Sequence, residues 1–257
     1  MQYEVNVSDV LNSIATSNLS QDVKASVEQF LQSLGEDKIT IFTTEGQPSQ
    51  IPSGVDLVIV QPGTGLTSDP GAPIIIFNKD AQPFSGQLDG SDDRVVIASG
   101  SDDKLIFTTT QDGEAGNITV ESGGGNDYIK TIGGNDLVAL TGTGNVTVET
   151  GAGNDMIYIQ SSIQHATVDG GAGVDVIRLD GTAANHIITY EDNAIIIDGK
   201  IVATGIERIE FSDGTHWNLG QHDQAQQDIY QHSTEPIQVS QDDDGNNIVI
   251  VDHPFAG

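Results

Sequence analysis

Short apolar runs separated by glycine-rich turns fill most of the chain. Between residues 122 and 176 one unit recurs, in which a turn rich in glycine and asparagine precedes three to five apolar or β-branched residues. The period is marked by Asp127, Asp136, Asp155 and Asp175, which follow one another at nine, nineteen and twenty residues. A repeat of about nine to ten residues is typical of a β-helix with one turn and one short strand per unit. Two units then make one coil of a flattened solenoid, and the turns gather on two sides.

The apolar pattern predicts further strands upstream of the repeats. KITIFTT, VDLVIVQPG and APIIIFN are β-rich runs bounded by Gly and Pro, with centres about seventeen residues apart. That spacing equals the coil length of a solenoid whose turns lack Asp. We therefore predict an all-β fold, a parallel β-solenoid from about residue 38 to 211 with a core of stacked Ile, Val and Leu.

The first 37 residues predict helices instead of strands. Ser20 is a candidate N-cap, and a helix from there places five apolar residues on one face before Gly35 ends it: Val23, Val27, Phe30, Leu31 and Leu34. A shorter helix is expected from Ser8, with Val10, Leu11 and Ile14 inward. We expect this helical cap to plug the open end of the solenoid core. Partner binding by the amphipathic pair is the alternative.

The C-terminal region loses the Asp turns after residue 176. Residues 179–220 predict hairpins that cap the last coil, with Trp217 closing that end. Inward and outward positions are expected to alternate, with Ile206, Ile209 and Phe211 facing in and Glu207, Arg208 and Glu210 facing out. The polar stretch 221–247 is typical of a weakly structured linker, and an apolar run follows from Ile248 to Val251.

The Asp positions predict a cation site. Asp136, Asp155 and Asp175 would stack on one side of the solenoid, and Asp103 and Asp127 on the other, about 4.8 Å apart on neighbouring coils. Stacked carboxylates repel, and a divalent cation between them reverses the sign of the interaction. Calcium suits such turns because it accepts carboxylate and backbone carbonyl oxygens in loose geometry, whereas zinc and copper favour His or Cys. A single such turn would be ordinary turn chemistry, but a ladder at fixed period favours calcium.

These turns resemble a known family. GGGNDYI, GGNDLV, GAGNDMI and GGAGVDVI are similar to the glycine- and aspartate-rich nonapeptide of RTX proteins, the calcium β-roll of type I secretion substrates. The match covers residues 88–177, roughly a third of the chain. The resemblance implies several calcium ions held by turn Asp side chains and turn carbonyls. The residues it implies are Asp93, Asp103, Gly123, Gly125, Asp127, Gly134, Asp136, Gly151, Gly153, Asp155, Gly171, Gly173 and Asp175.

The repeats also depart from the family pattern. Val146 and Ile118 stand where Asp belongs, SSIQHATV has lost the turn glycines, and the coils exceed the family's length of about eighteen residues. The column that holds Asp127 is therefore expected to be incomplete, and the column from Asp136 to Asp175 intact.

Composition limits the function classes. Nine basic and 38 acidic residues leave a formal net charge of −29, which excludes nucleic acid as a natural partner and argues against anionic membrane surfaces. The chain has no cysteine, no visible signal peptide and no apolar run long enough to span a membrane. It also has no GxSxG, HExxH or P-loop motif, and its six histidines are scattered. We therefore do not expect an enzyme.

The combined expectation is a secreted, calcium-binding structural protein that folds on calcium binding and self-assembles at the bacterial cell surface, as part of an S-layer, filament or biofilm matrix. The alternative is a monomeric calcium-dependent adhesin or a module that binds polysaccharide or a protein partner. An exposed row of Tyr, Trp or Asn at the coil period would favour that alternative, and none is evident in the sequence. By resemblance the C-terminal tail is an export signal; its apolar run could instead be an assembly strand. The expected segments are 1–37 (helical cap), 38–87 (coils without calcium turns), 88–178 (calcium β-roll), 179–220 (β cap) and 221–257 (tail).

Overall fold

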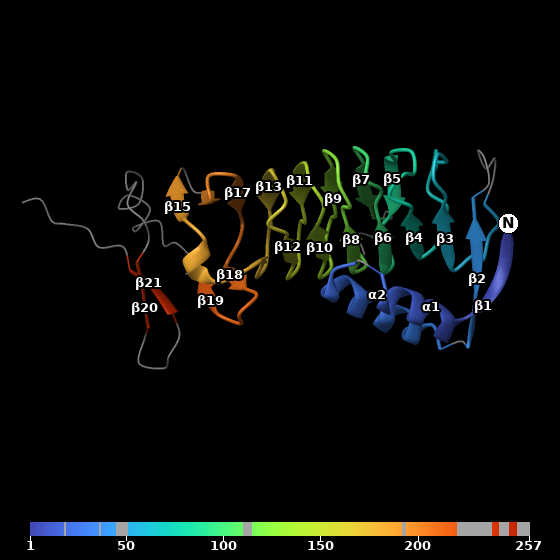
Figure 1. Ribbon diagram of the computed structural model, residues 1–257, viewed down its shortest axis with the longest axis horizontal. Coiled ribbons are helices and arrows are strands. Elements are labelled where there is room, and N and C mark those ends of the chain that lie inside the picture. Colours follow the sequence, from blue (N-terminus) through green and yellow to red (C-terminus); the bar gives the residue numbers. More distant parts are fainter. Residues whose placement is uncertain are drawn as a thin grey trace, which may run out of the picture.

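The fold is an elongated parallel β-solenoid, which confirms the expected class (Figure 1). The computed structural model describes residues 1–17, 19–35, 37–44, 51–109, 115–191 and 194–219, together with the backbone of residues 238–241 and 247–250. The strands of these segments form two sheets that face each other along the solenoid axis, and a separate two-stranded hairpin lies near the C-terminus.

The first sheet, here called the long sheet, has eleven strands. In spatial order they are β1 (Gln2–Asn6), β2 (Lys38–Thr43), β3 (Leu57–Val60), β4 (Ile74–Phe77), β6 (Arg94–Ile97), β8 (Ile118–Glu121), β10 (Leu137–Leu140), β12 (Met156–Ile159), β14 (Val176–Leu179), β18 (Arg208–Phe211) and β19 (His216–Asn218). All neighbours from β2 to β18 are parallel, whereas β1 and β19 run antiparallel at the two edges.

The second sheet, the short sheet, has eight strands. In spatial order they are β15 (Ile188–Glu191), β16 (Ala194–Ile197), β17 (Ile201–Thr204), β13 (His165–Asp169), β11 (Asn145–Glu149), β9 (Tyr128–Lys130), β7 (Lys104–Thr108) and β5 (Ser85–Asp89). The strands from β5 to β17 are parallel, and β15 to β17 form an antiparallel meander at the C-terminal end, after a short 3-10 turn at Ala183–Asn185.

The register of the long sheet gives the coil length directly. Leu137 pairs with Met156 and Met156 with Val176, so these coils are nineteen and twenty residues long. In the early coils Ile41 pairs with Leu57, a separation of sixteen residues. The repeat read from the Asp positions is therefore the repeat of the strands.

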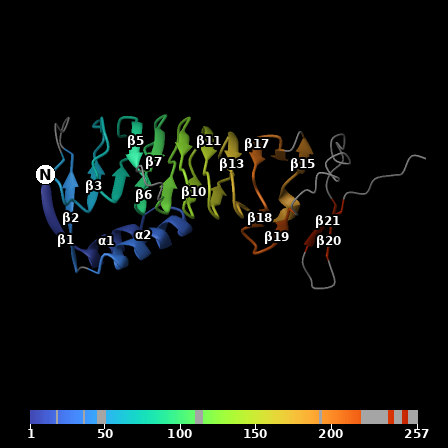
Figure 2. The ribbon, with the colours of Figure 1, turned by 180° about the vertical axis from the view of Figure 1, so that it is seen from behind.

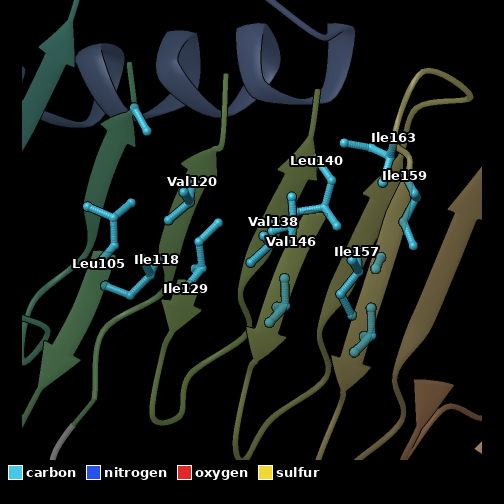
Figure 3. Close-up of a cluster of buried hydrophobic side chains, with 14 of the residues drawn as sticks. Leu105, Ile118, Val120, Ile129, Val138, Leu140, Val146, Ile157, Ile159 and Ile163 are labelled. Atoms are coloured by element: carbon cyan, nitrogen blue, oxygen red, sulfur yellow. The ribbon is translucent and has the colours of Figure 1, made fainter. Parts of the chain in front are cut away.

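The inner core lies between the two sheets and consists of stacked aliphatic residues (Figure 3). One row follows the long sheet through Val120, Val138 and Ile157, and a facing row follows the short sheet through Leu105 and Ile129, all essentially inaccessible to solvent. Alternate residues of each strand point into this space, because successive side chains of a strand lie on opposite faces.

The two helices, α1 (Val7–Ala15) and α2 (Gln21–Ser33), do not plug the solenoid end. They lie along the outer face of the long sheet, as both views show (Figures 1 and 2). Their buried residues form a second core with outward residues of the long sheet; its members include Val23, Val27, Leu31, Ile39, Ile41, Leu57, Ile74 and Val95. The expected plug is therefore wrong, and residues 2–6, expected to belong to the helical cap, form β1, which pairs with β2 at the N-terminal edge.

The predicted start and end of α2 are confirmed, although the predicted packing of the helices is wrong. The Ser20 hydroxyl accepts a hydrogen bond from the backbone N–H of Val23 at 3.3 Å, as an N-cap does. The helix ends at Ser33, just before Gly35 with its φ of 65°. The spacing of apolar residues predicts which face of an amphipathic helix is buried, but it does not predict which surface of the protein covers that face.

Continuous apolar runs mark the strands that are covered on both faces. The strands LVIV of β3 and IIIF of β4 bury residues toward the inner core and toward the helices. Strands of the short sheet, such as NVTVE of β11, alternate because only one of their faces is covered.

The C-terminal cap follows the expected pattern in its core. Ile206, Ile209, Phe211 and Trp217 are buried, and the Phe211 and Trp217 rings meet edge to face with centroids 5.3 Å apart. Beyond it, β20 (Gln238–Gln241) and β21 (Asn247–Ile250) form an antiparallel hairpin. Part of the expected linker is thus a strand, and the apolar run pairs within its own chain; residues 221–237, 242–246 and 251–257 lie outside the described segments.

Candidate metal centre

The turns between the two sheets stack in two columns. Turns 131–136, 150–155 and 170–175 lead into strands of the long sheet, and we call them the long-sheet column. Turns 98–103, 122–127 and 141–144 lead into strands of the short sheet and form the short-sheet column. Each turn lies against the corresponding turns of the neighbouring coils, because the strands that follow them are paired in register.

In the long-sheet column each Asp binds the coil that precedes it. Oδ1 of Asp155 accepts the backbone N–H of Asp136 at 2.8 Å, and Oδ1 of Asp175 accepts that of Asp155 at 2.8 Å. Oδ1 of Asp136 accepts the N–H of Ile118 at 2.7 Å. At the C-terminal end Oε2 of Glu207 accepts the N–H of Asp175 at 2.8 Å, so the acidic ladder continues into the cap.

The short-sheet column contains a shorter ladder of the same kind. Oδ1 of Asp127 accepts the backbone N–H of Asp103 at 2.8 Å, and Oδ1 of Asp103 accepts that of Phe84 at 2.6 Å. Val146 occupies the position next to Asp127 in the following coil, as the pairing of β9 with β11 shows. The column is therefore incomplete beyond Asp127, as the sequence indicated, and the side chain of Val146 joins the inner core.

Four of the column carboxylates have an oxygen that no protein group satisfies. Oδ2 of Asp127, Asp136, Asp155 and Asp175 is buried and has no hydrogen-bond partner, and each of these residues is at most 4% exposed. Against the larger effect of burial, the hydroxyls of Thr131 and Thr150 lower the pKa values of Asp136 and Asp155, but they donate to the backbone carbonyls of Thr150 and Gly170. Burial raises the pKa of Asp127 to about 8 and the pKa values of Asp136 and Asp175 to about 7; it also raises the pKa of Asp155. A buried carboxylate oxygen without a partner is costly, so a proton or a cation is needed there near neutral pH.

Backbone carbonyls crowd the gap between stacked turns. A Cβ atom built on Gly153 would overlap the carbonyl oxygen of Gly134, and one on Gly173 would overlap that of Gly153. Their φ angles of 143° and 145° lie in a region that side-chain-bearing residues rarely adopt. The carbonyl oxygens of Gly134 and Gly153 therefore approach the turn of the next coil closely. The other glycines expected at the site also have positive φ: Gly123, Gly125, Gly134, Gly151 and Gly171.

The donors along the columns are oxygen atoms, the kind that calcium accepts. Within the described segments, no three His, Cys, Asp or Glu side chains are grouped so that they could hold a metal ion by themselves, so backbone carbonyls would have to complete a site. The available donors are the free Asp oxygens and the turn carbonyls, all of them oxygen. Calcium takes six to eight such ligands and accepts carbonyls beside carboxylates. The residues that would hold it are Asp127, Asp136, Asp155 and Asp175, with carbonyls of the stacked turn glycines.

Two of the expected site residues do not share this environment. Oδ2 of Asp103 accepts both the N–H and the hydroxyl of Ser99 at 2.8 Å, so its two oxygens are satisfied by protein donors. Asp93 is exposed and precedes the column position, which Arg94 fills. In GSDDRVV the second Asp stands one residue before the column position, and a shift of one residue places a side chain on the other face.

The structure also reveals exposed amide rows that our sequence analysis missed. In one row Oδ1 of Asn117 accepts the N–H of Asn135 at 2.7 Å, and Oδ1 of Asn135 accepts that of Asn154 at 2.8 Å. A second row includes Asn126 and Asn145, where Oδ1 of Asn126 accepts the N–H of Asn145 at 3.1 Å. The expectation that no exposed Asn row exists at the coil period is therefore wrong. The sequence does contain the pattern for such a row, since Asn directly precedes Asp in most of the repeats.

The predicted orientation of Glu207 is also wrong. It was expected to face outward, yet its carboxylate receives the Asp175 N–H and ends the acidic ladder. In the sequence, TGIE gives the turn glycine and the acidic residue, but an inserted hairpin separates them from the repeats. Register in the folded sheet was needed to align Glu207 with the column.

Comparisons with protein-family models, with curated proteins and with solved structures found no match to this chain. Among the described residues, neither helix is long and apolar enough to cross a lipid bilayer.

Proposed function

We propose that this chain is a secreted calcium-binding structural protein of the RTX type, which folds on calcium binding and self-assembles at the bacterial cell surface as an S-layer, filament or biofilm-matrix component. The observation that carries the proposal is the set of four buried Asp residues with an unsatisfied Oδ2 on stacked, carbonyl-lined turns. They supply the hard oxygen donors that calcium prefers.

The proposed mechanism is folding by ion binding. Without calcium, burying these carboxylates opposes folding, and the net charge of −29 adds repulsion throughout the chain. Binding to the folded state alone stabilises it by RT ln(1 + [L]/Kd), about 1.4 kcal/mol per site at a tenfold excess of calcium. Several sites together can decide a marginal fold. The low calcium concentration of the cytosol would leave the chain unfolded and ready for export, and the higher calcium concentration outside the cell would then drive its folding.

Self-association is supported by an edge of the long sheet. β1 is the terminal strand at the N-terminal edge, and no strand of the described segments pairs with its outer side. At the opposite edge β21 of the same chain lies beside β19. An edge such as that of β1 is a template for pairing with another chain. End-to-end contact between copies would extend the solenoid into a filament.

The second candidate function is a monomeric calcium-dependent adhesin or a module that binds polysaccharide. The exposed Asn row favours it, because Asn117 and Asn135 line a cavity of about 350 Å³ beside α2, together with Gln29 and Phe30. Amide groups beside an aromatic ring suit a polyhydroxylated ligand.

Sedimentation velocity with a chelator and with a few millimolar calcium tests these proposals. Compaction to an elongated monomer on calcium addition would support folding by calcium and favour the binding module. Compaction followed by large species would support assembly. No change in shape or mass would show that the Asp columns are not calcium sites and would overturn the proposal.

A further inference from the structure

Arg94 occupies a position of the long-sheet column that Asp residues hold in later coils. It pairs in register with Ile118, whose N–H is bound by Asp136, so Arg94 lies at the N-terminal head of the acidic ladder. The residue is only 5% exposed. A buried guanidinium in this position places a permanent positive charge at the start of a column of carboxylates.

The partners of Arg94 are of the same types that a calcium ion would take. Its guanidinium donates two hydrogen bonds to the carboxylate of Asp69, at 2.7 and 2.8 Å. It donates two more to the backbone carbonyls of Asp89 and Ala72, at 2.9 and 2.8 Å. Burial raises the pKa of Asp69, but hydrogen bonds from Arg94 and from backbone N–H groups outweigh this effect and leave the pKa below its usual value.

We infer that Arg94 substitutes for a calcium ion, so that residues 1–109 fold without calcium and the calcium requirement begins with the coil that contains β8. This inference rests on the proposed function and divides the chain into a calcium-independent N-terminal body and calcium-dependent coils. The N-terminal body is defined here as residues 1–109, and the calcium-dependent coils as residues 115–179.

The state of the acidic groups supports this division. In the N-terminal body Asp69 is paired with Arg94, and both oxygens of Asp103 accept hydrogen bonds from protein donors. In the calcium-dependent coils Asp127, Asp136 and Asp155 each retain a buried oxygen without a partner. The charge that needs an external cation therefore begins after residue 109.

The distribution of apolar contacts supports it as well. In the N-terminal body the strands β2, β3, β4 and β6 bury both faces, inward against the solenoid core and outward against α1 and α2. From β8 onward the outward residues under the helices include Thr119 and Glu121. Most buried members of this second core belong to the N-terminal body, whereas the later coils add buried Ala139 and the partly buried Leu137 and Tyr158. Apolar burial is the dominant stabilising term in folding.

The helical hairpin spans the border between the two parts. Its tip is held on the calcium-dependent coils: the N–H of Ser20 donates to Glu121 at 3.1 Å, and the Ser26 and Thr119 hydroxyls lie 2.6 Å apart. Asp22 accepts two hydrogen bonds of 2.9 Å from Arg178 on β14. Loss of calcium should therefore release the tip near residue 20 and loosen α2 where it contacts β8.

Hydrogen–deuterium exchange of the full chain, followed by mass spectrometry in chelator and in calcium, tests the inference. In chelator, peptides from β2, β3, β4, β6 and β7 should stay protected, whereas peptides covering 118–179 should exchange at least about a hundredfold faster than in calcium. Peptides at the helical tip should exchange faster as well.

Two other outcomes would each overturn a different claim. If the whole chain loses protection in chelator and regains it in calcium, the division at Arg94 is wrong while folding by calcium stands. If the whole chain is protected in both conditions, the proposed function itself fails. Neither result depends on a variant that could fail to fold.

Two variants in the long-sheet column test whether the stability of the N-terminal body depends on Arg94 in particular. Arg94→Gln should remove protection of 57–97 in chelator, because Asp69 then loses its cation. Asp136→Asn, placed two coils later in the same column, should leave that protection unchanged and weaken only the calcium response of residues 118–179. Equal effects of the two variants on 57–97 would contradict the assignment of Arg94.

Discussion

The backbone N–H of Asp136 donates to Oδ1 of Asp155 across neighbouring coils at 2.8 Å, while Oδ2 of Asp155 is buried without a partner. The two oxygens of one carboxylate thus have different roles. One closes the turn ladder, and the other is left for a proton or a cation. The neighbouring Asn row runs in the opposite direction, since Oδ1 of Asn135 accepts the N–H of Asn154 at 2.8 Å. Reciprocal bonds therefore lock each pair of turns, whichever group satisfies Oδ2.

Asp155→Asn should separate these two roles. The Asn side-chain oxygen can still accept the Asp136 N–H, but the charge of the second oxygen is lost. We expect calcium affinity to fall by about tenfold or more, because ligand charge tunes calcium binding. Titration calorimetry and the calcium-induced rise in Tm measure this. The matched control is Asp102→Asn, an exposed residue whose Oδ1 accepts the Asn126 N–H; the same loss of affinity in the control would contradict a special role for Asp155.

The stability of the calcium-free chain should fall as pH rises. Burial raises the pKa of Asp127 to about 8 and those of Asp136 and Asp175 to about 7, all above the ordinary value of 3.8. The folded state therefore holds protons that the unfolded state releases, and this stabilisation is present at about pH 4 and lost as pH rises through 7 to 8. Urea unfolding in chelator between pH 5 and 8 should show a decreasing midpoint.

Calcium supplies the control for the pH prediction. At saturating calcium the same carboxylates are ionised and bound, so the decrease between pH 5 and 8 should disappear or reverse. A calcium-free midpoint that rises with pH would show that the column carboxylates are already ionised and satisfied in the folded chain.

Gly153→Ala should disrupt the long-sheet column. The new Cβ would overlap the Gly134 carbonyl oxygen, and φ is 143° at this position. We expect a loss of more than about 2 kcal/mol in calcium, from strain and displaced carbonyls together. Gly199→Ala is the control, because φ is 65° there but no atom lies within 4 Å of the Cβ position. A cost equal to that of Gly199→Ala, about 1 kcal/mol, would mean that the coils do not press on each other at Gly153.

Leu31→Ala should destabilise the chain whether or not calcium is present. Leu31 is 1% exposed in the core between α2 and the long sheet, so truncation should cost about 2–5 kcal/mol. Chemical denaturation monitored by the helical circular dichroism signal measures this in calcium and in chelator. The exposed neighbour Gln32 gives a control variant, Gln32→Ala, for which we expect less than about 0.5 kcal/mol. If Leu31→Ala left the free energy of unfolding unchanged, the helices would not stabilise the fold by covering the sheet, and binding of a partner would be the better explanation for them.

Local patterns in the sequence determined the architecture of this protein. The nine- to ten-residue period of glycine turns and apolar runs gave the solenoid, its coil length and the Asp columns, because one turn and one strand form a unit whose register repeats. Ser20 gave the start of α2, and the alternation around Ile209 gave the inner face of the cap. Each of these features depends on interactions between residues close in sequence or one coil apart.

The tertiary structure alone decided which surfaces meet and which residue of a pair enters the column. The amphipathic face of α2 packs on the outer face of the long sheet, a surface assembled from strands that are distant in sequence. Arg94 and not Asp93 fills the column, and Glu207 ends the ladder after a long insertion. The physical reason is the register between strands. Register decides whether a given side chain faces the core or solvent, and it is fixed only when the strand pairs with its neighbours in the folded sheet.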